Sequence, residues 1–90
     1  MADLSVAVAI VNWNTAEDAA RAAASFAAST GVRAQVRVID NHSREDQRQL
    51  LSELCDPAIK VLLSERNLGF GAAANAALEG VDADFVCLTR

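Results

Sequence analysis

The sequence predicts a three-layer αβα protein in which a mainly parallel sheet of four strands lies between helices. Short apolar, β-branched runs alternate with alanine- or leucine-rich stretches of helical character, in the order β-α-β-α-β-α-β. Short connections between them favour right-handed crossovers and parallel strands, as in Rossmann-like proteins. The composition agrees, because 90 residues with 52% hydrophobic and 22% charged side chains describe one globular domain, residues 1–90.

The first part of the chain is expected to form two strands and a helix. Leu4 to Val11 is an almost continuous apolar run, which is typical of a strand covered on both faces. Thr15 and Asp18 have capping-box spacing, and they open a helix predicted to reach Ser29. Ala34 to Ile39 alternates between apolar and polar residues and is expected to form the second strand.

The second part of the chain continues the alternation. The leucines of Arg44 to Leu54 favour a helix, and Pro57 prevents it from continuing into the apolar strand Ile59 to Leu63. An alanine-rich helix is predicted over Gly71 to Leu78, and Asp84 to Thr89 is predicted to be the fourth strand.

Charge and cysteine usage exclude several classes of protein. The net charge is −4 and the basic residues are scattered, so we expect no binding to nucleic acid. We also expect no membrane span and a cytoplasmic location, because no apolar run approaches about 20 residues and no basic segment precedes the first one. Cys55 and Cys87 form no C-x-x-C pair and lie in apolar segments, which favours buried free thiols.

Polar side chains follow the first three predicted strands, where the carboxyl ends of parallel strands meet at one edge of the sheet. They suit a nucleotide: Trp13 would stack on a base, Asp40 or Asn41 would accept a hydrogen bond from a base or ribose, and Arg66 would pair with phosphate. The alternative is that these loops are polar because they meet water. The three polar segments are residues 12–14, 40–43 and 64–67.

Residues 69–74 match the dinucleotide fingerprint G-x-G-x-x-G/A, but their context disfavours that function. A polar loop separates them from the preceding strand, and the first strand-to-helix turn contains no glycine. Gly69 and Gly71 are better explained as a tight helix start, with a positive φ or a close backbone approach, which is compatible with a phosphate nearby. His42 has no neighbouring histidine or cysteine, so no metal site is predicted there.

Four segments occur in a specific order and spacing: VAIVNWN at residues 8–14, VIDNHS at 38–43, SERNLGFG at 64–71 followed by Asn75, and DFVCLT at 84–89. Together they resemble the amino-terminal part of family 2 glycosyltransferases of the GT-A fold, in particular rhamnosyltransferase-like members. The resemblance covers essentially the whole chain. It implies a partial GT-A fold that binds a nucleotide sugar of the UDP or dTDP type. The complete enzyme would transfer the glycosyl group to an acceptor hydroxyl in polysaccharide synthesis.

The resemblance also implies roles for individual residues. Trp13 takes the place of the aromatic residue beside the base, and Asp40 and Asn41 take the places of residues that contact the base. Many members have two acids there, so Asn41 departs from the pattern. Arg66 and Asn67 match residues near the base and diphosphate. The implied nucleotide-binding set is Asn12, Trp13, Asn14, Asp40, Asn41, Ser43, Arg66, Asn67, Gly69 and Asn75.

The resemblance implies Mg²⁺ or Mn²⁺ in the complete enzyme, held by an acidic motif directly after the fourth strand. The given sequence stops at Arg90 before such a motif. We therefore expect a truncated domain without catalytic or metal-binding residues, inactive alone and holding no metal firmly; the complete enzyme would lie in the cytoplasm or at the membrane periphery. We also expect a homodimer or other self-association through an exposed sheet edge or the helices. The rival hypothesis is a noncatalytic Rossmann-like interaction module.

Overall fold

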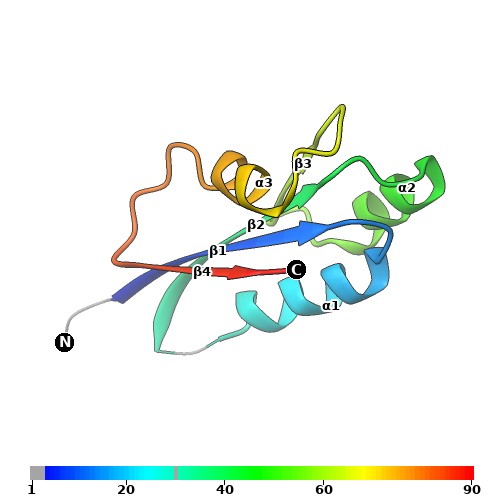
Figure 1. Cartoon of the computed structure of the whole chain (residues 1–90). Helices are drawn as coiled ribbons and strands as arrows, with labels where there is room; N and C mark the ends of the chain where they lie inside the picture. The colour runs from blue at the N-terminus through cyan, green and yellow to red at the C-terminus, as the bar shows by residue number, and fades with distance from the viewer. Residues whose placement is uncertain (1–3, 30) are drawn as a thin grey trace.

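The structure, a computed structural model, describes residues 4–29 and 31–90. Within these ranges four strands form one sheet in the order β3-β2-β1-β4, with every neighbouring pair parallel. The predicted alternation of strands and helices is confirmed (Figure 1). The elements are β1 (Leu4–Asn12), α1 (Ala16–Ala27), β2 (Val32–Asp40), α2 (Glu45–Leu54), β3 (Lys60–Leu63), α3 (Phe70–Ala77) and β4 (Phe85–Thr89).

Helices cover both faces of the sheet, so the predicted three layers are confirmed (Figure 1). Because successive side chains of a strand point to opposite faces, β1 supplies both cores. Val8 and Ile10 belong to the apolar cluster that includes residues of α1 and α2. Ala9 and Val11 belong to the cluster that includes residues of α3. This double burial explains the continuous apolar run at the start of the sequence.

The order of the strands reverses next to β1. The chain proceeds from β1 to β2 and β3 on one side, and then returns to place β4 on the other side of β1. β1 pairs with β2 as far as Asn12 opposite Asp40, and with β4 as far as Ile10 opposite Thr89. In open parallel sheets, ligands bind beyond the carboxyl ends of the strands at such a reversal.

β4 is an edge strand that exposes large apolar side chains. Phe85, Val86 and Leu88 are 58%, 56% and 50% exposed. Because it lies on the same edge strand, Cys87 is only partly buried. The expectation of two buried thiols is therefore wrong for this residue. Cys55 is buried, and burial raises the pKa of its thiol. No helix in the described ranges is both long and apolar enough to cross a bilayer.

The start of β4 is fastened to the start of β1 by Asp84. Its carboxylate oxygen Oδ2 accepts hydrogen bonds from the backbone N–H of Ser5 at 2.9 Å and from Ser5 Oγ at 3.2 Å. These two bonds, together with the charge of Arg33, lower the pKa of Asp84. The sequence pattern does not reveal this contact, because the two residues are 79 positions apart.

The expected capping box of α1 is not formed. Thr15 precedes the helix but makes no side-chain cap; its hydroxyl donates to Asn12 Oδ1 at 3.0 Å instead. The free N–H of Ala16 donates to Gln47 Oε1 of α2 at 2.9 Å. A neighbouring helix therefore supplies the acceptor that the local sequence was expected to supply. The helix also ends at Ala27, two residues before the predicted boundary.

Candidate functional site

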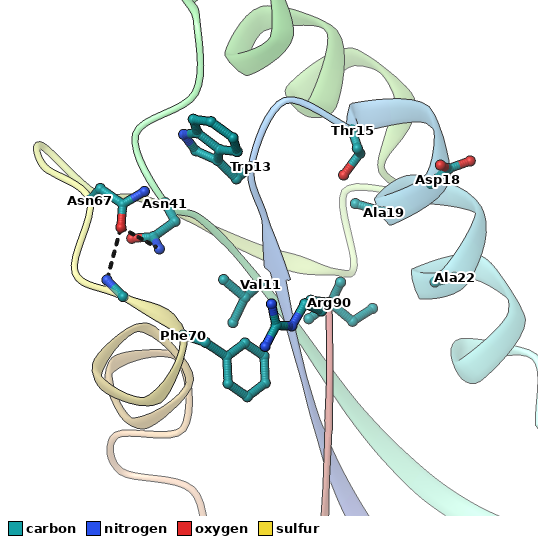
Figure 2. A pocket seen from close by; sticks show the side chains of 12 residues that line it. Val11, Trp13, Thr15, Asp18, Ala19, Ala22, Asn41, Asn67, Phe70 and Arg90 are labelled. Carbon is teal, nitrogen blue, oxygen red and sulfur yellow. Dashed lines mark hydrogen bonds between the residues drawn. The ribbon is translucent and has the colours of Figure 1, made fainter.

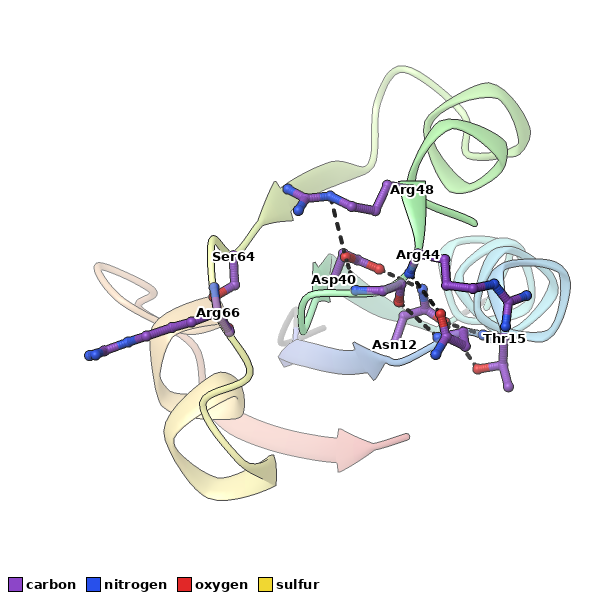
Figure 3. Close-up of polar contacts among 9 residues, drawn as sticks. Asn12, Thr15, Asp40, Arg44, Arg48, Ser64 and Arg66 are labelled. Carbon is purple, nitrogen blue, oxygen red and sulfur yellow. Dashed lines mark hydrogen bonds and ion pairs between the residues drawn. The ribbon is translucent and has the colours of Figure 1, made fainter. Parts of the chain in front are cut away.

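Asp40 ends β2, and its side chain is wholly buried in a polar network (Figure 3). Oδ1 accepts a hydrogen bond from Asn12 Nδ2 at 2.9 Å, and Oδ2 accepts one from the Ser43 N–H at 2.9 Å. The guanidinium Nε of Arg48 on α2 lies 3.6 Å from Oδ2. Both oxygens thus bind protein groups from β1, α2 and the loop that follows β2. The carboxylate joins these segments and has no exposed surface for a ligand.

The loop after β1 is fastened to the loop after β2. Asn12 Oδ1 accepts hydrogen bonds from the N–H and the hydroxyl of Thr15. Asn14 has a φ of +59°, a left-handed conformation that asparagine tolerates better than most residues. Its N–H donates to Ser43 Oγ at 2.7 Å, and its Oδ1 accepts from the Arg44 N–H at 2.8 Å. These reciprocal bonds fix the direction in which the intervening Trp13 leaves β1.

Asn41, directly after β2, and Asn67, in the loop before α3, form a hydrogen-bonded pair of side-chain amides (Figure 2). Asn41 Oδ1 accepts from the Leu68 N–H at 2.8 Å, and Asn67 Oδ1 accepts from the Gly69 N–H at 2.9 Å. Asn67 Oδ1 also accepts from Asn41 Nδ2 at 3.2 Å. Because backbone N–H groups only donate, these contacts identify the oxygen of each amide. The Nδ2 of Asn67 points to the side of Trp13 and has no hydrogen-bond partner in residues 4–29 and 31–90.

A pocket of about 480 Å³ lies at the carboxyl end of β1, where the strand order reverses. Its volume and its apolar wall with a few polar groups are typical of small-molecule sites. Trp13 and Phe70 bring aromatic rings to it, and the Asn41–Asn67 amide pair lies at its edge (Figure 2). The lining residues are Ile10, Val11, Trp13, Thr15, Asp18, Ala19, Ala22, Asn41, Asn67, Gly69, Phe70 and Arg90.

Arg90 follows β4 and reaches into this pocket, whereas Arg66 does not line it. The Arg90 guanidinium carbon lies 4.8 Å from the centroid of the Phe70 ring. The Arg66 side chain is exposed and points away from the polar network (Figure 3). Asn75 is exposed on α3 and is also outside the lining. Sequence reasoning missed Arg90 and Phe70. The signal for Arg90 was its place directly after a predicted strand.

Gly71 lies inside α3 and has no positive φ. Gly69 directly precedes α3 with a φ of +78°, which confirms the predicted tight helix start at this residue. The left-handed conformation favours glycine, although a Cβ here would meet no atom within 4 Å. Conformation rather than crowding therefore explains this glycine. The backbone turns here from the amide pair into the helix that carries Phe70.

The sequence matches the family model for glycosyl transferase family 2 over residues 7–89. This chain belongs to that family. It is also similar to the succinoglycan biosynthesis protein ExoO of Rhizobium meliloti (strain 1021), with 32% identity over 73 residues. The match covers 81% of this chain and 21% of ExoO, so the chain spans about a fifth of the length of that relative. The parallel αβα sheet agrees with a partial GT-A fold.

The family 2 motifs divide into three groups in the structure. Trp13, Asn41, Asn67 and Gly69 line the pocket. A second group lies in the polar network behind it, and a third group, Arg66 and Asn75, lies outside the pocket. The members of the second group are Asn12, Asn14, Asp40 and Ser43.

Family 2 glycosyltransferases commonly use a divalent metal ion. Mg²⁺ at a phosphate-binding site is usually held by one or two carboxylates together with water and the phosphates of the substrate. In the ranges that the structure describes, no group of three or more His, Cys, Asp or Glu residues is placed to hold one. Asp18 lines the pocket as a single carboxylate, and Asp40 is engaged in the polar network. Among the described residues that line the pocket, Asp18 is thus the one acidic side chain.

Proposed function

We propose that this chain binds the nucleotide part of a UDP- or dTDP-sugar for a family 2 glycosyltransferase. The pocket beside Trp13 carries this proposal. The exposed indole offers a face on which a planar base stacks. The Nδ2 of Asn67 is a donor for a base carbonyl, and uracil and thymine both carry such acceptors at their edge.

The remaining motif residues support this contact indirectly. We assign Asn12, Asn14, Asp40 and Ser43 the role of holding the two loops that place Trp13 and Asn41. Their bonds are complete within the protein, and that suits positioning better than ligand contact. The predicted nucleotide contacts of Arg66 and Asn75 stay predictions. Neither side chain lines the pocket.

In the complete enzyme, the bond between the anomeric carbon and the diphosphate oxygen breaks, and a bond to the acceptor oxygen forms. The acceptor proton passes to a base, and UDP or dTDP leaves. The similarity to ExoO, whose name refers to succinoglycan biosynthesis, supports a role in polysaccharide synthesis. We further propose that the 90 residues alone bind the donor without transferring its sugar. The free cysteines suit a reducing compartment such as the cytoplasm.

Trp13 makes the test direct, because it is the single tryptophan of the sequence. The chain is titrated with UDP, dTDP, ADP and NAD, each with and without Mn²⁺, while Trp13 fluorescence is followed. We expect saturable quenching by UDP or dTDP at lower concentrations than by ADP. Tight, metal-independent binding of NAD, or equal binding of all four nucleotides, would contradict the proposal.

The exposed edge of β4 favours a second candidate function, association with another copy of the chain. Phe85, Val86 and Leu88 lie beside a row of backbone groups that pair with no other strand in the described ranges. Two β4 strands related by a twofold axis would pair antiparallel and join two sheets into one.

Light scattering over a range of concentrations tests this association. We expect a dimer mass that Val86→Lys converts to the monomer mass, with Lys60→Gln as a surface control on β3. A concentration-independent monomer mass for the unmodified chain would contradict it. A chain that dimerises but binds no nucleotide would support the noncatalytic interaction module instead.

A further inference from the structure

We propose that Arg90 is the residue of this pocket that binds the phosphate groups of the nucleotide. The inference rests on the proposed function above and adds a specificity residue to it. It transfers to Arg90 the phosphate contact that the sequence pattern suggests for Arg66. Three observations carry it: the position of Arg90, its cation–π contact with Phe70, and its being the one cation among the described residues that line the pocket.

The position of Arg90 is set by the strand order. β4 pairs with β1 and ends beside it, so the residue after Thr89 emerges at the reversal of the sheet. Figure 2 shows Arg90 close to Phe70 and well separated from Trp13 and Asn67. A nucleotide whose base lies on Trp13 would therefore extend its phosphates along the pocket toward Arg90.

The Arg90 guanidinium lies over the Phe70 ring. The distance of 4.8 Å from the ring centroid is within the range of a cation–π contact. A guanidinium stacked on a ring uses its face for the ring and keeps the N–H groups at its edge available. Those N–H groups match two phosphate oxygens at once, so the side chain is arranged for a phosphate before it binds.

The charges around the pocket leave Arg90 as the available cation. Among the described residues that line it, Arg90 and Asp18 are charged, and Asp18 pairs with Arg21 at 3.3 Å. Arg90 has no ion pair with an acid in residues 4–29 and 31–90.

Two arginines outside the pocket, one on α2 and one on β2, are engaged with protein groups. Arg48 is held by buried Asp40. Arg37 donates to the backbone oxygens of Ala77 and Glu79. Arg90 is therefore the positive charge that is available to a phosphate in the pocket.

The test compares ligands that differ only in their phosphates. Uridine, UMP and UDP are titrated against the 90-residue chain and followed by Trp13 fluorescence. For Arg90→Gln we expect the Kd of UDP to rise about tenfold, the effect of one charge-assisted hydrogen bond, while the Kd of uridine stays within about twofold. Arg90→Lys keeps the charge but not the planar fork, so the loss should be smaller.

Lys60→Gln is the matched control, since it also removes one exposed positive charge but lies on β3. It should leave all three affinities unchanged. Added salt should weaken UDP binding to the unmodified chain more than to Arg90→Gln. Circular dichroism of each variant verifies that the fold is retained.

The outcomes separate the two proposals. If Arg90→Gln weakens uridine and UDP equally, or if Arg66→Gln rather than Arg90→Gln weakens UDP selectively, the assignment of Arg90 is overturned while the nucleotide pocket stands. If the unmodified chain binds neither UDP nor dTDP, the proposed function fails and the assignment of Arg90 fails with it.

Discussion

Two polar clusters lie at the same edge of the sheet. In one, the hydrogen-bonding groups are bonded within the protein, and in the other, some of them are open to a ligand. Around Asp40, both carboxylate oxygens are bonded to the protein and are closed to solvent. Around the pocket, the N–H groups of the Asn67 Nδ2 and of the Arg90 guanidinium donate to no protein acceptor in the described ranges. One cluster holds the loops in place, and the other is free to bind a ligand.

The alternation of side chains along a strand produces this difference. Val38 and Asp40 lie on the face of β2 that packs toward α1 and α2, where Arg48 meets the carboxylate. Ile39 lies on the opposite face, toward α3, and Asn41 continues toward the pocket. Neighbouring residues of one motif can therefore have separate roles, one in positioning and one in contact.

The largest effect is expected from Asp40→Ala. The change leaves the Asn12 amide, the Ser43 N–H and the partly buried Arg48 guanidinium without their acceptor, and we expect the free energy of unfolding to fall by about 3 kcal/mol. Urea unfolding followed by circular dichroism measures it. Asp46→Ala is the control, because this carboxylate is 71% exposed and should contribute less than about 0.5 kcal/mol. Equal losses in the two variants would refute the division into two clusters.

The next effect is expected from Trp13→Ala, which acts on the open cluster. The side chain is 58% exposed, so its removal should leave the unfolding free energy nearly unchanged. Loss of base stacking should cost about 2 kcal/mol of binding, or roughly 30-fold in the Kd of UDP. Calorimetry measures the affinity, with Leu63→Ala on β3 as a control of similar exposure. A variant that binds UDP normally would show that the indole is not a stacking surface.

A smaller and more selective effect is expected from Asn67→Asp. The substitution keeps the oxygen that accepts from Gly69 and Asn41, and replaces only the outward NH₂ donor with an acceptor. Binding of UDP should weaken about tenfold relative to CDP, because cytosine presents an amino donor where uracil presents a carbonyl. Competition titrations give the ratio. Gln49→Glu on α2 controls for the added charge, and an unchanged ratio would exclude Asn67 from base recognition.

The smallest effect is expected at the opposite end of the sheet, from Asp84→Asn. The folded-state pKa of Asp84 is lowered by its bonds to Ser5, so its stabilisation is complete above the unfolded pKa and is lost as the pH falls through the folded value. The melting temperature should therefore decline less between about pH 5 and pH 2 in Asp84→Asn than in the unmodified chain. Asp82→Asn serves as the control. Parallel acid profiles for all three proteins would contradict this account.

The fold could be predicted from the sequence because each element carries a local signal. The apolar run of β1 and the alternation in β2 identify a covered central strand and its neighbour. The boundaries are less accurate, since β2 begins at Val32 rather than Ala34. Backbone pairing with Leu4 extends the strand beyond its apolar residues.

The candidate site was only partly predictable, because it depends on the order of strands and on rotamers. The motif places Trp13, Asn41 and Asn67 at one edge, and the structure brings them to one pocket. No local pattern shows that β4 returns beside β1, so the approach of Arg90 to Phe70 was missed. The burial of Asp40 was also hidden, because its ion-pair partner Arg48 lies on another element.

The thin packing of α3 has a consequence for motion. This helix buries three alanines and packs on β1 and β2, whereas α1 packs on α2 as well as on the sheet. α1 buries four alanines and has a second helix packed on it, so α3 removes less apolar surface from water, and we expect its amides to exchange with deuterium faster than those of α1. Because Gly69 and Phe70 form one wall of the pocket, a nucleotide that binds only while α3 is folded must slow that exchange. Ligand binding and the order of this helix are thus thermodynamically linked.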